Sequence, residues 1–185
     1  MTISTVLKNA QMTSQISIQQ RASAIQLLVL DVDGVLTDGR LYFGADGEAL
    51  KVFHVRDGAG LVQLRKAGIE IAIISGRNSP SVNARMKELG INHVHQGVKD
   101  KLAVLQQLKQ QLSIQDDGIA CVGDDTPDIP MFSLAQLSVA VADAHPQVRA
   151  AAHYVTTLEG GKGAVREVCD LIVESSVHAG VSIPA

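Results

Sequence analysis

Carboxylate side chains that could take part in phosphoryl transfer follow two apolar runs of the sequence. Asp31 and Asp33 come after the run Ile25–Leu30, and Asp124–Asp125 follows the run 119–122 and one glycine. If both runs are parallel strands, these carboxylates gather at one edge of the sheet, where ligands bind in such folds. Crowded carboxylates repel one another and require a hard cation that accepts oxygen ligands. Mg²⁺ satisfies this requirement, so the sequence predicts a magnesium site.

Residues suited to binding a phosphate group follow a third apolar run and open a predicted helix. Ser75, Gly76 and Arg77 come directly after Ile69–Ile74, and Lys101 begins the helical pattern that precedes the run 119–122. A lysine can neutralise a phosphate, and a serine hydroxyl with nearby backbone N–H groups can bind its oxygens. Arg77 is a candidate ligand for a phosphate or carboxylate, or a surface arginine at a helix start.

The order of these residues indicates a phosphatase that forms a covalent intermediate. Asp31 is placed to attack phosphorus, as carboxylates do in aspartyl-phosphate enzymes. Asp33 can donate a proton to the leaving oxygen and later accept one from water. Taken singly, each motif has a simpler explanation, such as a capped turn or a solvated lysine. All of them occur in order, each at a strand end or helix start, and this favours a site.

Apolar runs alternate with helical patterns, which predicts an α/β fold. We expect a three-layer, Rossmann-like, mostly parallel sheet with helices on both faces. The expected strands are Ile25–Leu30, Ile69–Ile74, His93–His95, Ile119–Val122, Leu137–Val141 and Tyr154–Val155. The expected helices are Ala59–Lys66, Ser79–Leu89, Lys99–Leu112, Asp128–Ala135 and Ala164–Val177.

One segment breaks this alternation, because Leu41–Val55 resembles two strands around an Asp46-Gly47 turn. We expect a β-hairpin after the first strand, inside a single domain over residues 25–177. A polar leader over 1–24 and a tail over 178–185 would flank that domain. The segments between the candidate site residues hold only the hairpin, short strands and single helices, which leaves no room for a cap domain.

An open site must exclude water by other means, and a partner subunit over the crevice would do so. We therefore expect oligomerisation through the hairpin; the alternative is a hairpin that packs on its own core.

The formal net charge of −3 gives no basic excess for nucleic acid or an anionic membrane. Cys121 and Cys169 lie in apolar patterns that indicate core positions in a reducing compartment, so the expected location is the cytoplasm.

The motifs D-V-D-G-V, I-I-S-G, a lysine and G-D-D-x-x-D, in this order, resemble the haloacid dehalogenase superfamily of phosphohydrolases. The resemblance covers about residues 25–175. It implies that Asp31 is the nucleophile and Asp33 the acid and base. It also implies that Ser75 and Lys101 bind the phosphate.

The same resemblance implies a ligand set for Mg²⁺. The ion would be bound by the carboxylate of Asp31, the main-chain carbonyl of Asp33 and the carboxylate of Asp124. Asp125 and Asp128 would support these ligands from outside the first coordination shell.

Longer motifs at Ser138–Pro146 and Gly160–Asp170 resemble a capless subclass of the superfamily. Its members remove phosphate from a sugar acid during synthesis of lipopolysaccharide precursors, and the resemblance implies a homotetramer that meets at the hairpins. Arg56, just after the hairpin, and Lys162, in a glycine-rich loop, are then candidate ligands of the sugar acid. Asp57 has two open interpretations, a site residue or a helix start.

Three alternatives compete with this interpretation, and the sequence argues against the second of them. The substrate could be another sugar-acid phosphate, such as an acylneuraminate 9-phosphate. A receiver domain also combines acidic residues, a lysine and a parallel sheet, but its third strand ends in an aspartate, whereas here Gln96-Gly97 follows. The chain could also be a relative without catalytic activity that serves as a scaffold.

Overall fold

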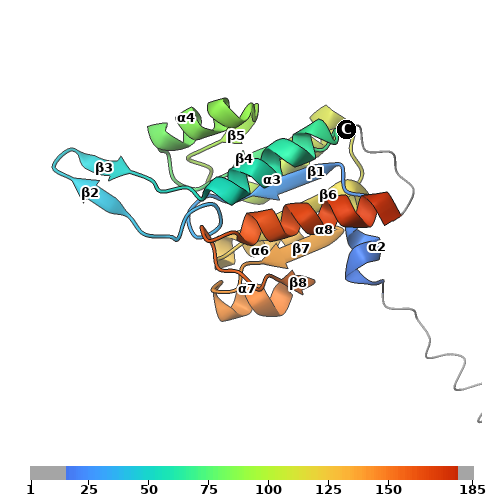
Figure 1. Cartoon of the computed structure of the whole chain (residues 1–185). Coiled ribbons are helices and arrows are strands. Elements are labelled where there is room, and N and C mark those ends of the chain that lie inside the picture. Colours follow the sequence, from blue (N-terminus) through green and yellow to red (C-terminus); the bar gives the residue numbers. More distant parts are fainter. Residues whose placement is uncertain (1–15, 179–185) are drawn as a thin grey trace, which may run out of the picture.

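A six-stranded parallel sheet forms the centre of the computed structural model, which describes residues 16–178 (Figure 1). Its strands, in spatial order, are β5 (His93–His95), β4 (Glu70–Ile74), β1 (Leu27–Leu30), β6 (Ile119–Gly123), β7 (Leu137–Ala140) and β8 (Tyr154–Val155). Every neighbouring pair is parallel. The central strands are buried along their whole length, because their side chains are apolar on both faces and helices must cover each.

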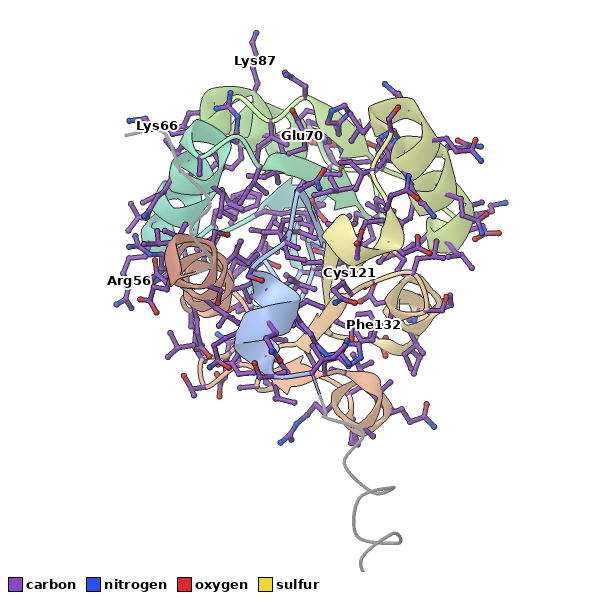
Figure 2. All side chains as sticks on the ribbon, turned by 90° about the vertical axis from the view of Figure 1, so that its right-hand side faces the viewer. Arg56, Lys66, Glu70, Lys87, Cys121 and Phe132 are labelled. Atoms are coloured by element: carbon purple, nitrogen blue, oxygen red, sulfur yellow. The ribbon has the colours of Figure 1, made fainter. Side chains whose placement is uncertain are left out.

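Helices cover the two faces of the sheet, as right-handed crossovers require when the chain leaves β1 in both directions. One face carries α3 (Val55–Lys66), α4 (Pro80–Leu89) and α8 (Ala164–His178), and the other carries α5 (Lys101–Leu112), α6 (Ile129–Phe132) and α7 (Pro146–Ala151). Figure 2 shows the two groups on either side of the sheet. The predicted three-layer α/β fold is confirmed. None of the described helices combines the length and apolarity that a bilayer crossing needs.

Local differences from the prediction occur at helix ends and in one short helix. The helix expected from Ala59 begins at Val55. Helix α7 was not predicted, because His145 and Pro146 resemble a turn; instead His145 is the N-cap, and its ring Nδ1 accepts a hydrogen bond from the Gln147 N–H at 3.3 Å. Short 3-10 turns, η1 (Asp116–Gly118) and η2 (Thr126–Asp128), flank β6.

A further helix lies within the segment expected to be a polar leader. Helix α2 (Ile18–Ala22) has a capping box at Ser17, and its Ala22 is fully buried. The helix contacts α8, so the chain enters the core before the predicted start of the domain. Residues 1–15 of the expected leader and 179–185 of the expected tail lie outside the described residues.

The hairpin forms a two-stranded sheet of its own, from β2 (Tyr42–Gly44) and β3 (Gly47–Leu50). Figure 1 shows it projecting away from the central sheet. Its apolar side chains stay exposed in the single chain, at 65% for Phe43 and 54% for Val52. The hairpin therefore does not bury these side chains on its own core.

Glu167 in α8 binds both β8 and the segment that follows it. Its carboxylate accepts hydrogen bonds from the Tyr154 hydroxyl at 2.6 Å and from the hydroxyl and N–H of Thr157 at 2.7 and 2.9 Å. The Leu158 N–H lies 3.2 Å from the same group. One side chain thus satisfies several donors of a segment with little regular structure, and it fixes the start of the glycine-rich loop 159–163.

We predict that Glu167→Gln lowers the free energy of unfolding by about 1–2 kcal/mol at neutral pH, because hydrogen bonds to a charged acceptor contribute about this much. Burial alone would raise the pKa of Glu167, but the bonds from Tyr154 and Thr157 lower it. The carboxylate therefore stabilises the fold above its pKa in the unfolded chain, and this contribution is lost as the pH falls through the lowered folded-state pKa.

Urea unfolding of both proteins, at neutral pH and near pH 3, would measure this difference. Glu88→Gln is the matched control, since Glu88 is exposed and, within the described residues, its one ion pair is with Arg85 in its own helix turn. Equal destabilisation by the two variants would contradict the prediction.

Candidate active site

The candidate site lies at the carboxyl ends of β1, β4 and β6, where the chain leaves the central strand β1 in opposite directions. A cavity of about 300 Å³ opens there. It is lined by Asp31, Asp33, Gly39, Ser75, Gly76, Arg77, Lys101, Asp124, Asp125, Pro127 and Asp128. The structure thus brings together the predicted acidic residues, the predicted phosphate ligands and Arg77 in one crevice.

Three carboxylates form the acidic centre of this cavity. Asp31, Asp124 and Asp128 each offer an oxygen within 4.8 Å of the others. Asp128 uses both of its oxygens within the protein: Oδ1 accepts from Lys101 Nζ at 2.6 Å, and Oδ2 accepts from the Asp124 N–H at 3.0 Å and the Asp125 N–H at 3.3 Å. Asp128 therefore supports the cluster and leaves cation binding to its neighbours.

The other two carboxylates keep a free oxygen. Oδ1 of Asp31 and Oδ1 of Asp124 are buried and have no hydrogen-bond partner among the described residues. Buried anionic oxygens without a donor are costly, so they indicate a missing positive ligand. The donor set fits a hard divalent cation bound by Asp31 and Asp124.

Burial raises the pKa of Asp31 to about 6, and the negative charge of Asp128 adds to this effect. Burial also raises the pKa of Asp124 to about 8, with Asp128 and then Asp31 as further causes. Both shifts have one origin, which is negative charge gathered where water cannot solvate it. A bound cation would reverse both.

Lys101 is the one cation in direct contact with the acidic cluster among the ion pairs of the described chain. It is the first residue of α5, behind the N-cap Asp100, whose carboxylate accepts from the Ala103 N–H at 3.0 Å. Its Nζ lies 3.0 Å from Asp31 Oδ2 and is also bonded to Asp128. Burial alone would lower its pKa, but the two carboxylates outweigh burial and raise it, so the group stays charged.

The residues after β4 differ in how firmly they are fixed. Ser75 is buried; its N–H donates to the His95 carbonyl at 2.9 Å, and its carbonyl accepts from the Val98 N–H at 3.0 Å. Arg77 instead reaches across to acidic side chains. Its Nη2 donates to Glu48 Oε2 at 3.1 Å, and its Nε lies 3.7 Å from Asp33 Oδ2.

One contact of Asp33 was not predicted. Lys51, which follows β3 of the hairpin, donates a hydrogen bond from Nζ to Asp33 Oδ1. The same Nζ lies 3.2 Å from Glu48 Oε2. The sequence indicated the hairpin as an assembly element only, and the lysine between Leu50 and Val52 carries no motif. The one feature of the sequence that could have indicated this contact is a charged residue with apolar neighbours on both sides.

Glycines let two loops approach the acidic cluster. Gly34 has a φ of 88°, and a Cβ there would lie 2.1 Å from Asp124 Oδ2. A Cβ on Gly160 would lie 1.7 Å from the Gly34 carbonyl oxygen, and the Gly161 N–H donates to the Val35 carbonyl at 2.9 Å. The glycine-rich loop therefore packs directly on the loop that carries Asp33.

Two predicted substrate ligands lie outside the cavity. Lys162 is exposed and pairs with Glu159. Arg56 lines a separate cavity of about 480 Å³, together with residues of α8 such as Arg166. Asp57 is buried, and its Oδ1 accepts from the Arg166 N–H at 2.8 Å, so it binds the first turn of α8.

Comparisons with known proteins identify related sequences and structures. Residues 93–168 match the model of a haloacid dehalogenase-like hydrolase family. The chain is 51% identical over 154 residues to the 3-deoxy-D-manno-octulosonate 8-phosphate phosphatase of Yersinia pestis. The matched region covers 83% of this chain and 82% of that protein. The chain belongs to the 3-deoxy-D-manno-octulosonate 8-phosphate phosphatase family. It is thus a phosphoric monoester hydrolase by family.

Solved structures of this phosphatase family have the same fold. One from Moraxella catarrhalis, in complex with a magnesium ion, a phosphate ion and a KDO molecule, has a TM-score of 0.84 and 44% identity, and covers 87% of this chain and 92% of that one. A cobalt-bound form from Haemophilus influenzae has a TM-score of 0.84 and 41% identity. The match covers 88% of this chain and 95% of that one.

We predict that the metal-free protein becomes less stable as the pH rises from about 4 to about 8. The folded-state pKa values of Asp31 and Asp124, about 6 and about 8, lie above the ordinary value of 3.8. The folded chain therefore binds more protons than the unfolded chain in this range, and the free energy of unfolding falls with pH. Added Mg²⁺ should flatten this slope, because the cation replaces the protons.

Urea unfolding across this pH range, with EDTA and then with excess Mg²⁺, would test the prediction. Asp124→Asn should flatten the slope without metal, whereas Asp117→Asn, at an exposed position in η1, should not. The same slope in EDTA and in Mg²⁺ would show that the carboxylates bind no cation.

Proposed function

We propose that this chain is a Mg²⁺-dependent phosphatase that hydrolyses 3-deoxy-D-manno-octulosonate 8-phosphate to the free sugar acid and phosphate. The observation that carries the proposal is the pair of unpartnered buried oxygens on Asp31 and Asp124, beside Lys101, in a chain of this family. The reaction would supply a lipopolysaccharide precursor. The proposed compartment is the cytoplasm, consistent with two buried free thiols, Cys121 and Cys169.

The proposed reaction has two steps. In the first, the Asp31 carboxylate forms a bond to phosphorus while the bond from phosphorus to the sugar oxygen breaks, and Asp33 gives that oxygen a proton. In the second, water attacks phosphorus, Asp33 accepts its proton, and the bond to Asp31 breaks. Phosphate leaves and both carboxyl groups return to their first states.

The remaining residues of the cavity position and neutralise the phosphoryl group. Mg²⁺, bound by Asp31, Asp124 and the Asp33 carbonyl, would supply charge neutralisation for the phosphoryl oxygens. Lys101 contacts Asp31 directly, so its ammonium lies within reach of a phosphoryl group on that residue. Ser75 and the backbone of Gly76 offer hydrogen bonds to the same oxygens. Asp128 keeps Lys101 charged, and Asp125 caps η2.

The sugar-acid end of the substrate is less constrained by this cavity. Arg77 is the exposed cation at its rim and remains a candidate for the sugar carboxylate or the phosphate. Arg56 and Lys162 do not line the cavity, so a part in binding would require the site of a neighbouring subunit. Another sugar-acid phosphate, such as acylneuraminate 9-phosphate, is therefore the second candidate substrate.

The proposed assembly is a homotetramer joined through the hairpins. The hairpin leaves Leu41, Phe43, Leu50 and Val52 exposed, and several large apolar side chains exposed on one element favour an interface there. No cap domain covers the cavity in the described chain. A neighbouring subunit could supply that cover and exclude water from the reaction.

We predict that the purified chain with Mg²⁺ releases phosphate from 3-deoxy-D-manno-octulosonate 8-phosphate faster than from other sugar-acid phosphates. Asp31→Asn should abolish turnover, because an amide cannot form the acyl phosphate, and EDTA should do the same reversibly. Phosphate release across a substrate panel would measure both. Asp116→Asn, an exposed carboxylate beside Lys109, is the control and should keep full activity.

Activity that persists in Asp31→Asn would exclude the proposed nucleophile. Release of phosphate from other sugar-acid phosphates but not from 3-deoxy-D-manno-octulosonate 8-phosphate would favour the second candidate substrate. No release from any phosphate monoester would favour a scaffold without activity.

We predict that Phe43→Lys converts the tetramer to smaller species, because a charge in an apolar interface is left without a partner. Light scattering at several protein concentrations would measure the mass. Val177→Lys is the control, since Val177 is also exposed but lies on α8, away from the hairpin. A wild-type chain that is monomeric and fully active would contradict the assembly.

A further inference from the structure

Four charged side chains form a closed ring at the edge of the cavity, and two of them come from the hairpin. Lys51 contacts both Asp33 and Glu48, Glu48 accepts from Arg77, and Arg77 lies beside Asp33. The charges alternate around the ring and cancel. The hairpin is therefore bound to the candidate acid and base by its own side chains, in addition to its place in the chain.

Burial separates Lys51 from an ordinary surface lysine. Its side chain is 2% exposed, whereas that of the ion-paired Lys162 is 60% exposed. A buried ammonium is costly unless anions surround it, and removing one partner leaves the other uncompensated. Asp33 and Glu48 are the two anions within salt-bridge distance of it. The ion pair between Lys51 and Asp33 thus holds both side chains in place.

The two oxygens of Asp33 have different surroundings. Oδ1 accepts the hydrogen bond from Lys51, whereas Oδ2 is buried and has no hydrogen-bond partner among the described residues. Arg77 Nε, at 3.7 Å from Oδ2, is too distant to donate a hydrogen bond. An ammonium on Oδ1 fixes the rotation of the carboxyl group and leaves Oδ2 as the oxygen without a donor.

We propose that Lys51 is a positioning residue for the phosphatase reaction, which binds Oδ1 of Asp33 and leaves Oδ2 to exchange the proton with the leaving oxygen and with water. This inference rests on the proposed function, because it assigns Lys51 a part in the acid and base step. Lys51 itself touches neither the phosphate nor the sugar in this scheme, and it acts only through Asp33.

Substrates whose leaving groups differ in basicity distinguish a role in proton donation from a role in phosphate binding or in folding. A weakly basic leaving group such as p-nitrophenolate departs with little help, whereas phenolate needs a proton as its bond to phosphorus breaks. The two aryl phosphates are similar in size and carry no sugar acid. A defect in proton donation therefore lowers kcat/KM more for phenyl phosphate than for p-nitrophenyl phosphate.

The experiment compares Lys51→Met with the wild-type chain in the presence of Mg²⁺. We expect the ratio of kcat/KM for p-nitrophenyl phosphate over phenyl phosphate to rise about tenfold, a part of the 10²–10⁴-fold contribution of a general acid. On the sugar-acid phosphate we expect kcat to fall about tenfold or more with KM nearly unchanged. The ratio does not depend on how much of the variant is folded, since both substrates meet the same preparation.

Three variants serve as controls. Asp33→Asn should change the ratio in the same direction and further, because it removes the acid itself. Lys51→Arg keeps a cationic donor and should hold the ratio near the wild-type value. Lys109→Met removes an ion-paired lysine of α5 that contacts Asp116, away from the cavity, and should change nothing.

Equal losses of kcat/KM on both aryl phosphates, or a raised KM for the sugar-acid phosphate with kcat unchanged, would overturn the role of Lys51. If Asp33→Asn changes the ratio and Lys51→Met does not, this inference alone fails. If the wild-type chain releases no phosphate from any of the three substrates, the proposed function fails, and the role of Lys51 with it.

Discussion

The repulsion among three carboxylates at the ends of β1 and β6 is the constraint on which the site depends. Asp31, Asp124 and Asp128 each place one oxygen within 4.8 Å of the others, and Asp31 and Asp128 are buried while Asp124 is half-buried. Lys101 offsets part of that negative charge. The remaining negative charge, together with burial, raises the pKa values of Asp31 and Asp124. The cluster is therefore suited to binding a further positive charge.

Most of this site could be predicted because the chain places its chemistry at strand ends. Asp31, Ser75 and Asp124 follow apolar runs, so parallel pairing of those runs brings them together without further information. Lys101 could be predicted for a similar reason, since it opens the helix whose direction is set by the neighbouring strands. The fold class follows from the same alternation of strands and helices.

The remaining features depend on contacts between segments that carry no pattern of their own. The contact between Lys51 and Asp33 joins the hairpin to the loop after β1, and neither segment has a local pattern that reveals it. Helix α7 is only six residues long, too short for an apolar period to appear. The packing of Gly160 on Gly34 joins loops more than a hundred positions apart, and no spacing reveals it.

That glycine contact has a consequence for the order in which the enzyme becomes competent. The loop that carries Asp31 and Asp33 is made early in synthesis, but Gly160 and Gly161, which pack on it, are made late. Until those residues emerge from the ribosome, nothing from the last quarter of the chain supports the loop. A nascent or truncated chain can contain every residue of the acidic cluster and still lack the surface that holds it in place.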